Sequence, residues 1–500
     1  MTIKRASSGF RGLVAVSILA LLMGACDKGL TSLNKNPNDP ENVPVANILP
    51  NAIRSGVNQL MGVGWQLRLT GLWPQLYAEI QYPDEDRYIV RPSAIQAYWD
   101  GLYVNSLEDF QRIITKSGAA GGNPNYAAIA TIMKSWEFAS ASDVWGDMPY
   151  TDALEGDSTG NFKPAYTPQQ DIFNDILTKL AGVSSMMSSD PLDAVDASSD
   201  LIYGGDLSKW VKFANSLRLR YAMQIVNADP TKAEQEFTAA WSDPGGVIMS
   251  NDDNAEFRYL PSYPNDNPWH EDWRSRDDYA MSATLIDTLK SLNDPRLTYY
   301  AEPTDSGPTY QGMPNGIPND APKLKAVSRI GNYWRANPNG TFVIMGASEV
   351  MFLAAEAAER GWIAGNPATY YQDAIRLDMT KYKATAGSYT PYASDADIAT
   401  YLAQPRIQYA GGQAGLDQIH LQMWISFFGN ANEAYATWRR SGIPQLAIAA
   451  NNKQDAIPVR LPYADLEQSL NHDNWQAAVT AQGLTDGFST PVWWDKPPTP

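Results

Sequence analysis

The sequence predicts a mainly α-helical protein in which helix pairs pack against a loop-rich half. Apolar residues recur at spacings of three and four along most of the chain, whereas strand-like alternation is rare and short. Stretches dense in Pro, Asn, Asp and Gly separate the helical segments. The chain has 500 residues, of which 44% are hydrophobic and 19% charged, so it is long enough to bury a large core.

Four segments carry the helical pattern: residues 126–140, 206–221, 348–361 and 424–438. Asp206 is a suitable N-cap for the second segment. The alanines of the third leave little bulk, so a neighbouring helix can approach closely, and Gly361 can end it. We therefore expect amphipathic helices that pair in the manner of tetratricopeptide repeats, although no regular sequence period is visible.

Strands and long loops complete the predicted fold. Short strands are expected at residues 342–345 and 459–461. Loops are expected at residues 82–91, 229–277 and 293–339, which are dense in Pro, Asn, Asp and Gly. Because structureless stretches of more than about 12 to 15 residues are usually functional, these loops are where we expect the ligand site.

The N-terminus has the pattern of a bacterial export signal. Three basic residues, Lys4, Arg5 and Arg11, precede an apolar run at residues 13–23 that is too short to span a membrane, which needs about 20 residues. Cys26, the one cysteine of the chain, follows two small residues directly, as in a lipobox. We therefore expect Cys26 to be lipidated. The alternative is an ordinary secretory signal in which Cys26 is incidental.

These features divide the chain into three parts. We expect a signal peptide at residues 1–25, a lipidated cysteine and extended tether at residues 26–41, and a helical body at residues 42–500. Met23 and Asp27 depart from the usual lipobox, and an Asp at this position favours inner-membrane retention in some bacteria. The sequence therefore does not decide which membrane leaflet holds the lipid anchor.

Charge and composition exclude several function classes. The 38 basic and 55 acidic residues give a formal charge of −17, which repels phosphate backbones and argues against a nucleic-acid partner. A single Cys excludes a cysteine-rich metal centre, and an all-His centre would need every one of the three His. No metal or cofactor is therefore expected. Sequence signatures of nucleotide binding, zinc proteases and serine hydrolases are missing. The sequence does not exclude a pair of carboxylates that hydrolyses glycosides, because the distance between them depends on the fold.

Seven segments together resemble the SusD/RagB family of nutrient-binding outer-membrane lipoproteins, and specifically its SusD-like branch. Residues 36–53 (NPNDPENVPVANILPNAI), 98–110 (YWDGLYVNSLEDF) and 142–154 (SDVWGDMPYTDAL) carry the first part of the likeness. The rest is carried by residues 209–225 (KWVKFANSLRLRYAMQI), 293–297 (NDPRL), 349–361 (EVMFLAAEAAERG) and 435–446 (YATWRRSGIPQL). Any one segment alone is a weak signal, whereas their combination is specific.

The resemblance implies a fold, a location and a partner. It implies four tetratricopeptide-like helix pairs and a lipid-tethered protein at the cell surface. Such a protein acts without catalysis as the lid of a SusC-like, TonB-dependent transporter that imports oligosaccharides. A lid that binds peptides or another nutrient is the first alternative, and a lipid-anchored glycoside hydrolase is the second.

A glycan site needs a flat aromatic platform with planar polar groups at its edge. The predicted loops supply nine candidate ligand-binding residues: Tyr82, Arg87, Tyr88, Asn267, Trp269, Trp273, Arg274, Arg276 and Trp334. His270, between the two loop tryptophans, could titrate within such a site or be a partly exposed loop residue. Six other tryptophans at helical spacing or inside the family segments are expected to be core: Trp99, Trp136, Trp145, Trp210, Trp424 and Trp438.

Overall fold

The computed structural model describes residues 43–318, 326–483 and 485–497. The described residues from Val45 onward form one folded unit. The predicted signal peptide, Cys26 and the tether lie outside the described residues, so these assignments stay predictions. No helix in the described part of the chain is long and apolar enough to cross a membrane.

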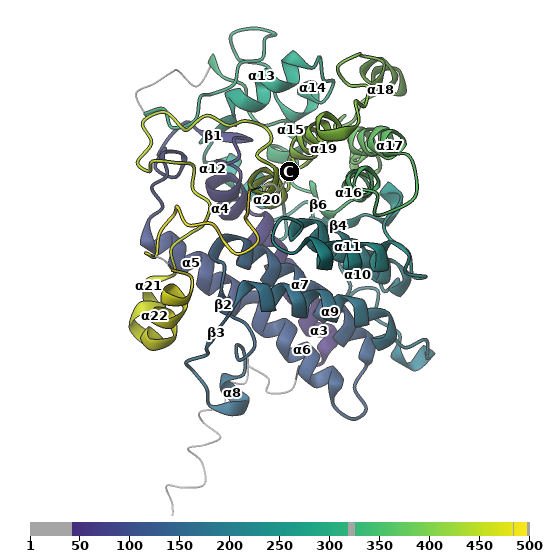
Figure 1. The fold of residues 1–500 in the computed structure, drawn as a ribbon, viewed down its shortest axis with the longest axis vertical. Helices are drawn as coiled ribbons and strands as arrows, with labels where there is room; N and C mark the ends of the chain where they lie inside the picture. Colours follow the sequence, from purple (N-terminus) through teal and green to yellow (C-terminus); the bar gives the residue numbers. More distant parts are fainter. Residues whose placement is uncertain (1–42, 319–325, 484, 498–500) are drawn as a thin grey trace, which may run out of the picture. The chain divides into compact units, whose positions relative to one another are not determined.

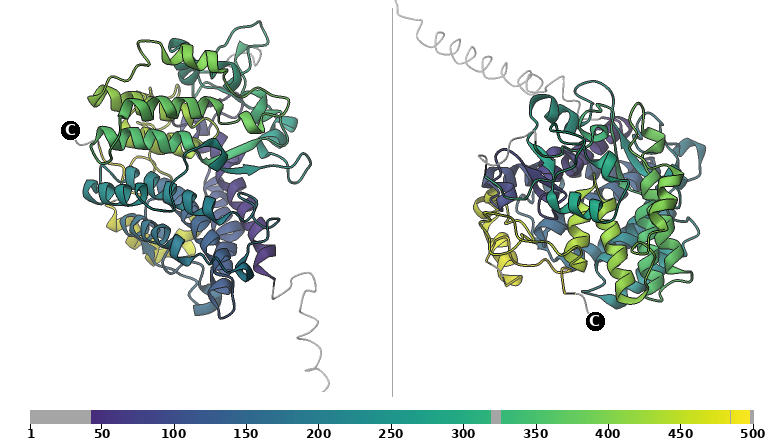
Figure 2. Two further views of the ribbon diagram at one scale, coloured as in Figure 1. Left: turned by 90° about the vertical axis from the view of Figure 1, so that its right-hand side faces the viewer. Right: turned by 90° about the horizontal axis from the view of Figure 1, so that it is seen from above.

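Helix pairs dominate the fold. The long helices are α3 (Val45–Met61), α5 (Pro92–Leu102), α6 (Glu108–Gly118), α7 (Pro124–Trp145), α9 (Gln169–Met186), α10 (Leu207–Gln224), α11 (Pro230–Trp241), α16 (Ala347–Glu359), α17 (Pro367–Thr380), α19 (Gly412–Ser426) and α20 (Ala431–Ser441). Four consecutive pairs pack closely: α6 with α7, α10 with α11, α16 with α17 and α19 with α20. Figure 2 shows them stacked as successive layers, with α9 joining α7 to α10 and α16 contacting both α10 and α19.

Shorter elements lie around these pairs. The short α-helices are α4 (Val63–Trp65), α8 (Gly156–Thr159), α12 (Pro268–Ser275), α13 (Ala283–Ser291), α14 (Leu297–Tyr300), α15 (Asn332–Arg335), α18 (Asp395–Leu402), α21 (Asp465–Leu470) and α22 (His472–Ala481). Figure 1 shows α13 and α14 at the top, α18 beside α17, α21 and α22 at the lower left and α8 at the lower end. The π- and 3-10 turns are η1 (Gln66–Thr70), η2 (Glu85–Arg87), η3 (Tyr103–Leu107), η4 (Pro191–Asp193), η5 (Asn251–Asp253) and η7 (Lys383–Thr385). Most of these elements are too short to be stable alone, so they depend on packing against the long helices.

The predicted helices are confirmed, with one exception. Asp206 caps α10 as expected, since its carboxylate accepts hydrogen bonds from the amides of Ser208 and Lys209. Gly361 follows α16 with a φ of +77°, which a glycine adopts without strain. The helix predicted over residues 424–438 is wrong in its middle, because the chain turns at Gly429 (φ +85°) and divides it into α19 and α20.

The described strands form three two-stranded antiparallel sheets. β1 (Tyr77–Glu79) pairs with β5 (Tyr279–Met281), β2 (Met148–Pro149) with β3 (Tyr166–Thr167), and β4 (Ala255–Arg258) with β6 (Thr341–Met345). β6 confirms the strand predicted at residues 342–345. The strand predicted at 459–461 is wrong, because that segment makes isolated hydrogen bonds to Phe488 and Val144 and joins no sheet.

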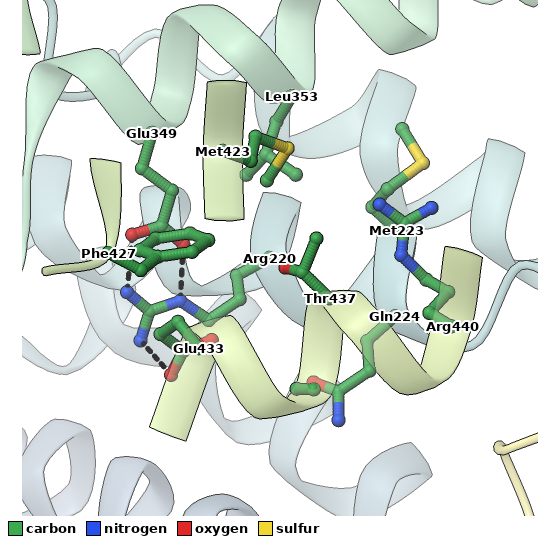
Figure 3. Close-up of a pocket in the computed structure, with 11 residues that line it drawn as sticks. Arg220, Met223, Gln224, Glu349, Leu353, Met423, Phe427, Glu433, Thr437 and Arg440 are labelled. Atoms are coloured by element: carbon green, nitrogen blue, oxygen red, sulfur yellow. Dashed lines mark hydrogen bonds and ion pairs between the residues drawn. The ribbon is translucent and has the colours of Figure 1, made fainter. Parts of the chain in front are cut away.

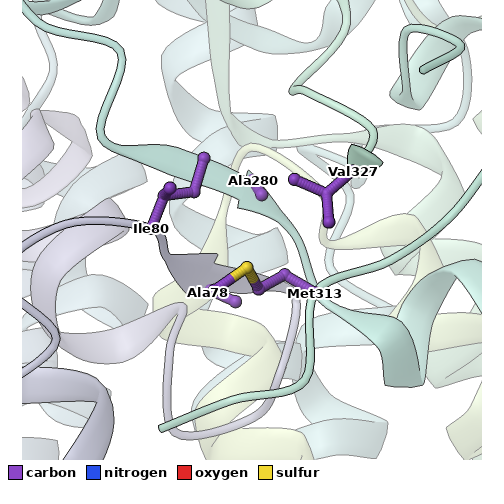
Figure 4. Packing of buried hydrophobic residues seen from close by; sticks show 5 residues of the cluster. All are labelled: Ala78, Ile80, Ala280, Met313 and Val327. Carbon is purple, nitrogen blue, oxygen red and sulfur yellow. The ribbon is translucent and has the colours of Figure 1, made fainter. Parts of the chain in front are cut away.

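The sheet of β1 and β5 anchors the loop-rich half. Figure 4 shows its small apolar core, made by Ala78, Ile80, Ala280, Met313 and Val327. Met313 and Val327 come from the segment that follows α14, so this core holds three distant parts of the chain together.

The loop predicted at residues 229–277 is largely structured. It contains α11, β4 and α12, so that prediction is wrong for much of its length. Asp229 and Asn267 each precede a proline and accept a hydrogen bond from a backbone amide in the first turn of a helix. The Asx-Pro pairs that suggested loops therefore begin helices.

Five of the six tryptophans expected in the core are buried: Trp99, Trp136, Trp145, Trp210 and Trp424. Trp438 is half-buried instead and stacks on Tyr435, with ring centres 6.3 Å apart. The helical spacing thus identified the core aromatic residues with one exception.

Glu137 predicts a pH-dependent stability. Its carboxyl group is buried in α7, where Ser106 Oγ donates to Oε2 over 2.7 Å, and burial raises the pKa to about 8. An ordinary Glu titrates near pH 4.3, so the folded state holds this proton more tightly than the unfolded state. Its contribution to stability is complete below about pH 4 and is lost as pH rises through about 8.

The Glu137→Gln variant should remove this dependence, because an amide mimics the protonated acid at every pH. We expect the melting temperature of the variant to fall less than that of the wild type between about pH 5 and 9. Calorimetry at a series of pH values measures the difference. Parallel pH profiles for the two proteins would contradict the assignment.

Candidate functional site

Strand pairing brings two of the predicted ligand segments together. In the antiparallel sheet Glu79 lies opposite Tyr279, and the Ile80 amide donates to the Asp278 carbonyl over 2.7 Å. The chain beyond β1 therefore runs beside the chain before β5. Tyr82 meets Arg276 in this way, with the guanidinium carbon 5.0 Å from the ring centre.

Asn267 connects the predicted segment around Trp334 to α12, beside the two segments that the strands bring together. Its Oδ1 accepts from the Trp269 amide over 2.9 Å and caps α12, while its Nδ2 donates to the Trp334 carbonyl over 3.0 Å. α12 consequently packs against α15 and also contacts α4 (Figure 1). The buried Asn267 thus positions the helices and is not itself a ligand contact.

A small cleft opens between these elements. Its lining comprises Leu67, Trp269, Asp272, Trp273, Arg276, Asp277, Tyr279, Ile330 and Arg335. Trp273 is half-buried, and the guanidinium carbon of Arg335 lies 5.7 Å from its ring centre. Tyr82, at 55% exposure, stands beside Arg276 at the rim. The cleft therefore presents one accessible aromatic ring, Trp273, and a second one, Tyr82, lies beside it at Arg276; each ring is flanked by an arginine.

The arginines are held in place by acidic neighbours. Asp277 accepts from Arg335 over 3.3 Å and contacts Arg329 at 3.4 Å, while Asp278 contacts Arg276 at 2.5 Å. Hydrogen bonding and charge from Asp278 raise the pKa of Arg276. Burial, assisted by the charge of Asp278, raises the pKa of Asp272 to about 6. The side chains at the cleft are therefore oriented before any ligand arrives.

Arg335 carries an unsatisfied donor at the cleft. Its Nε is buried and has no hydrogen-bond partner among the described residues. An unpaired buried donor costs about 1–3 kcal/mol, and a ligand oxygen would pair with this one only after the Arg335 side chain turned toward the cleft.

Two of the predicted platform residues lie in the core instead. Trp269 and Trp334 are each 1% exposed, so neither ring can stack on a ligand. Trp269 Nε1 donates to the Met61 carbonyl over 3.0 Å, and its ring meets Tyr77 edge-on at 5.6 Å. Trp334 packs against Phe428 with ring centres 4.8 Å apart. The prediction missed this because it placed both residues in loops, whereas both belong to helices packed on the body.

Three other predicted residues lie outside the cleft lining. Arg87 Nε donates to the Asn451 carbonyl over 3.2 Å, and the buried Tyr88 hydroxyl accepts from the Ala449 amide over 2.8 Å. Both therefore hold the segment near residue 450. Arg274 is an exposed partner of Glu271, at 2.6 Å.

Sequence reasoning missed several cleft residues. Asp277 and Tyr279 follow the predicted residue Arg276 within three positions. Their proximity in sequence was the available signal. Leu67 and Ile330 carry no polar group and could be placed only once the fold was known.

Two other pockets are lined by different kinds of side chain. The cavity in Figure 3 lies among α10, α16, α19 and α20, and its polar wall is a buried ion cluster centred on Arg220. An open groove along α3, η3 and α6 is lined by polar groups and one valine, with no aromatic side chain: Asn51, Ser55, Asn58, Gln59, Val104, Asn105 and Asp109. The cavity in Figure 3 also has an aromatic ring and arginines, but Phe427, Arg220 and Arg440 are buried, whereas Trp273, Arg276 and Arg335 of the cleft beside α12 are at least partly exposed.

Comparison with protein families identifies the fold. A family model described as "Starch-binding associating with outer membrane" matches residues 37–464. The chain belongs to the SusD-like family. The expected resemblance is thereby confirmed, as is the mainly α-helical fold with tetratricopeptide-like helix pairs. Members of the SusD-like family are binding proteins that associate with the outer membrane.

Solved structures agree with this assignment. A chitin-binding protein is 30% identical to this SusD-like chain, with a TM-score of 0.79 over 91% of this chain and 100% of the other. A chitin-binding SusD homologue from Flavobacterium johnsoniae is 23% identical, with a TM-score of 0.76 over 90% and 99%. A SusD homologue from Bacteroides fragilis is 24% identical, with a TM-score of 0.78 over 91% and 100%. No curated protein matches the chain.

Proposed function

We propose that this SusD-like chain is a cell-surface lipoprotein that binds oligosaccharides without catalysis. In this proposal it delivers them, as a lid, to a SusC-like, TonB-dependent transporter. The observation that supports the ligand class is the cleft beside α12, where Tyr82 and Trp273 accompany Arg276 and Arg335.

This combination suits sugars on physical grounds. A pyranose ring has an apolar C–H face that packs on an aromatic ring and a rim of hydroxyls that need planar donors and acceptors. The guanidinium groups of Arg276 and Arg335 offer donors, and Asp272 and Asp277 offer acceptors. Because neighbouring carboxylates hold the arginines, little side-chain freedom is lost on binding.

Chito-oligosaccharides are the first ligands to test. The support is the 30% identical relative described as a chitin-binding protein. The experiment is calorimetric titration of the purified 27–500 chain with chito-oligosaccharides, malto-oligosaccharides and a wider glycan panel. We expect saturable binding to at least one glycan class without release of reducing ends. Failure to bind any glycan would contradict the proposal, copurifying peptides would favour a peptide lid, and released reducing ends would favour a hydrolase.

The lipid anchor should be separable from ligand recognition. Cys26→Ala should release the protein from the membrane fraction, because the acyl chains have no other attachment point in this proposal. The glycan affinity of the purified body should not change, since the cleft lies far along the chain. Membrane fractionation and titration measure the two properties. A Cys26→Ala protein that stays with the membrane would contradict the tether.

A further inference from the structure

Three potential metal ligands meet at the start of α12. Asp266 directly precedes the N-cap of the helix, and His270 and Glu271 lie in its first turns. One ligand atom of each residue lies within 4.8 Å of those of the other two. His270 Nδ1 lies 3.3 Å from Asp266 Oδ2.

The Asp266 carboxylate has one oxygen that no hydrogen-bond donor of the described residues pairs with. Its side chain is 3% exposed, and one oxygen, Oδ1, is buried without any hydrogen-bond partner among the described residues. The same carboxylate touches His270 through Oδ2, so the unpaired oxygen lies at the cluster. A buried carboxylate oxygen without a donor is costly, and a bound cation would remove that cost.

We propose that Asp266, His270 and Glu271 bind a divalent transition-metal ion such as Zn²⁺. One imidazole nitrogen and two carboxylate oxygens suit zinc better than the all-oxygen shells of Ca²⁺ or Mg²⁺. Tetrahedral zinc, with bonds of about 2.1 Å, spaces its ligand atoms about 3.4 Å apart. The separation of 3.3 Å between His270 Nδ1 and Asp266 Oδ2 matches this spacing, and an ion that the Asp266 carboxylate binds through both oxygens would also pair the unsatisfied Oδ1.

Glu271 can take part without losing its present contact. Arg274 Nη1 donates to Glu271 Oε1 over 2.6 Å, which leaves Oε2 for the ion. Water would complete the fourth position, as in zinc sites with three protein ligands. The ion would join the residue before the N-cap to the first turns of α12, the helix that carries Trp273, and would therefore stiffen one wall of the cleft.

The test is a titration of the metal-stripped 27–500 chain with ZnCl₂. Titration calorimetry measures the zinc affinity and stoichiometry, and the melting temperature is measured with and without zinc. We expect one Zn²⁺ per chain and a higher melting temperature when zinc is bound. His270→Gln and Asp266→Asn should each lower the zinc affinity at least tenfold and abolish the melting shift. His472→Gln is the matched control, because His472 is exposed and its Nδ1 contacts a backbone carbonyl at 3.0 Å. Its zinc affinity should equal that of the wild type.

Several outcomes would overturn the site. These are the absence of stoichiometric zinc binding by the wild type, a preference for Ca²⁺ over Zn²⁺, and equal zinc affinity in wild type and His270→Gln. Circular dichroism of each variant without metal establishes that it is folded. Because zinc binding is measured without any glycan, the result does not depend on the proposed function.

Discussion

The Arg220→Met variant is expected to lose about 3–5 kcal/mol of its free energy of unfolding. Arg220 is 4% exposed and lies between two buried carboxylates (Figure 3). Its Nε lies 2.6 Å from Glu349 Oε1, and its Nη1 lies 3.1 Å from Glu433 Oε1. Removing the cation leaves both acids unpaired in the interior. Urea unfolding followed by circular dichroism measures the loss.

A compensated variant separates charge from packing. Burial raises the pKa of Glu433 to about 8 even beside Arg220, so this acid is already difficult to ionise. Adding Glu349→Gln and Glu433→Gln to Arg220→Met removes the stranded acids and should restore much of the lost stability. A loss below about 1 kcal/mol in Arg220→Met would show that the cluster contributes little to folding.

The Tyr82→Ala, Trp273→Ala double variant is expected to bind glycan about 100-fold more weakly than the wild type. Each aromatic ring contributes about 0.5–1.5 kcal/mol by stacking, in addition to the apolar area it buries, so about tenfold per ring is a reasonable expectation. Trp273 lines the cleft, Tyr82 lies beside its lining residue Arg276, and neither side chain is fully buried, so the variant should fold. Calorimetric titration with the best ligand from the panel measures the change.

Tyr263→Ala is the matched control for this pair. Tyr263 is 75% exposed and precedes α12, yet it is not among the cleft residues. Its removal should leave glycan affinity unchanged. If Tyr263→Ala weakened binding as much as the double variant, the platform would lie elsewhere on the surface.

Sequence periodicity predicted four helical segments of the framework, whereas helices such as α3, α9 and α17 were not assigned individually. The stepping of apolar residues around Trp136 and Trp210 identified α7 and α10, and Asp206 located the start of α10. Periodicity could not detect the break at Gly429, because apolar residues continue through the turn on both sides of it. Nor could Pro and Asn content distinguish a loop from a capped helix, as Asn267 illustrates.

The candidate site could be predicted by segment but not by residue. The segments around Tyr82, Trp273 and Trp334 do meet, because β1 pairs with β5 and Asn267 bridges α12 and α15. Which tryptophan faces the cleft depends on tertiary packing: Trp269 and Trp273 lie one helical turn apart, yet the first is buried against Tyr77. The sequence alone does not indicate which of the two tryptophans is buried.

The most direct measurement is a crystal structure of the 27–500 chain with a bound chito-oligosaccharide, or with the best ligand from the panel. We predict a sugar ring packed on Tyr82 or Trp273, with a hydroxyl or carbonyl oxygen accepting from the guanidinium group of Arg335 or Arg276. A sugar bound in the groove beside α3 instead, with the α12 cleft unchanged, would contradict the assignment of the site.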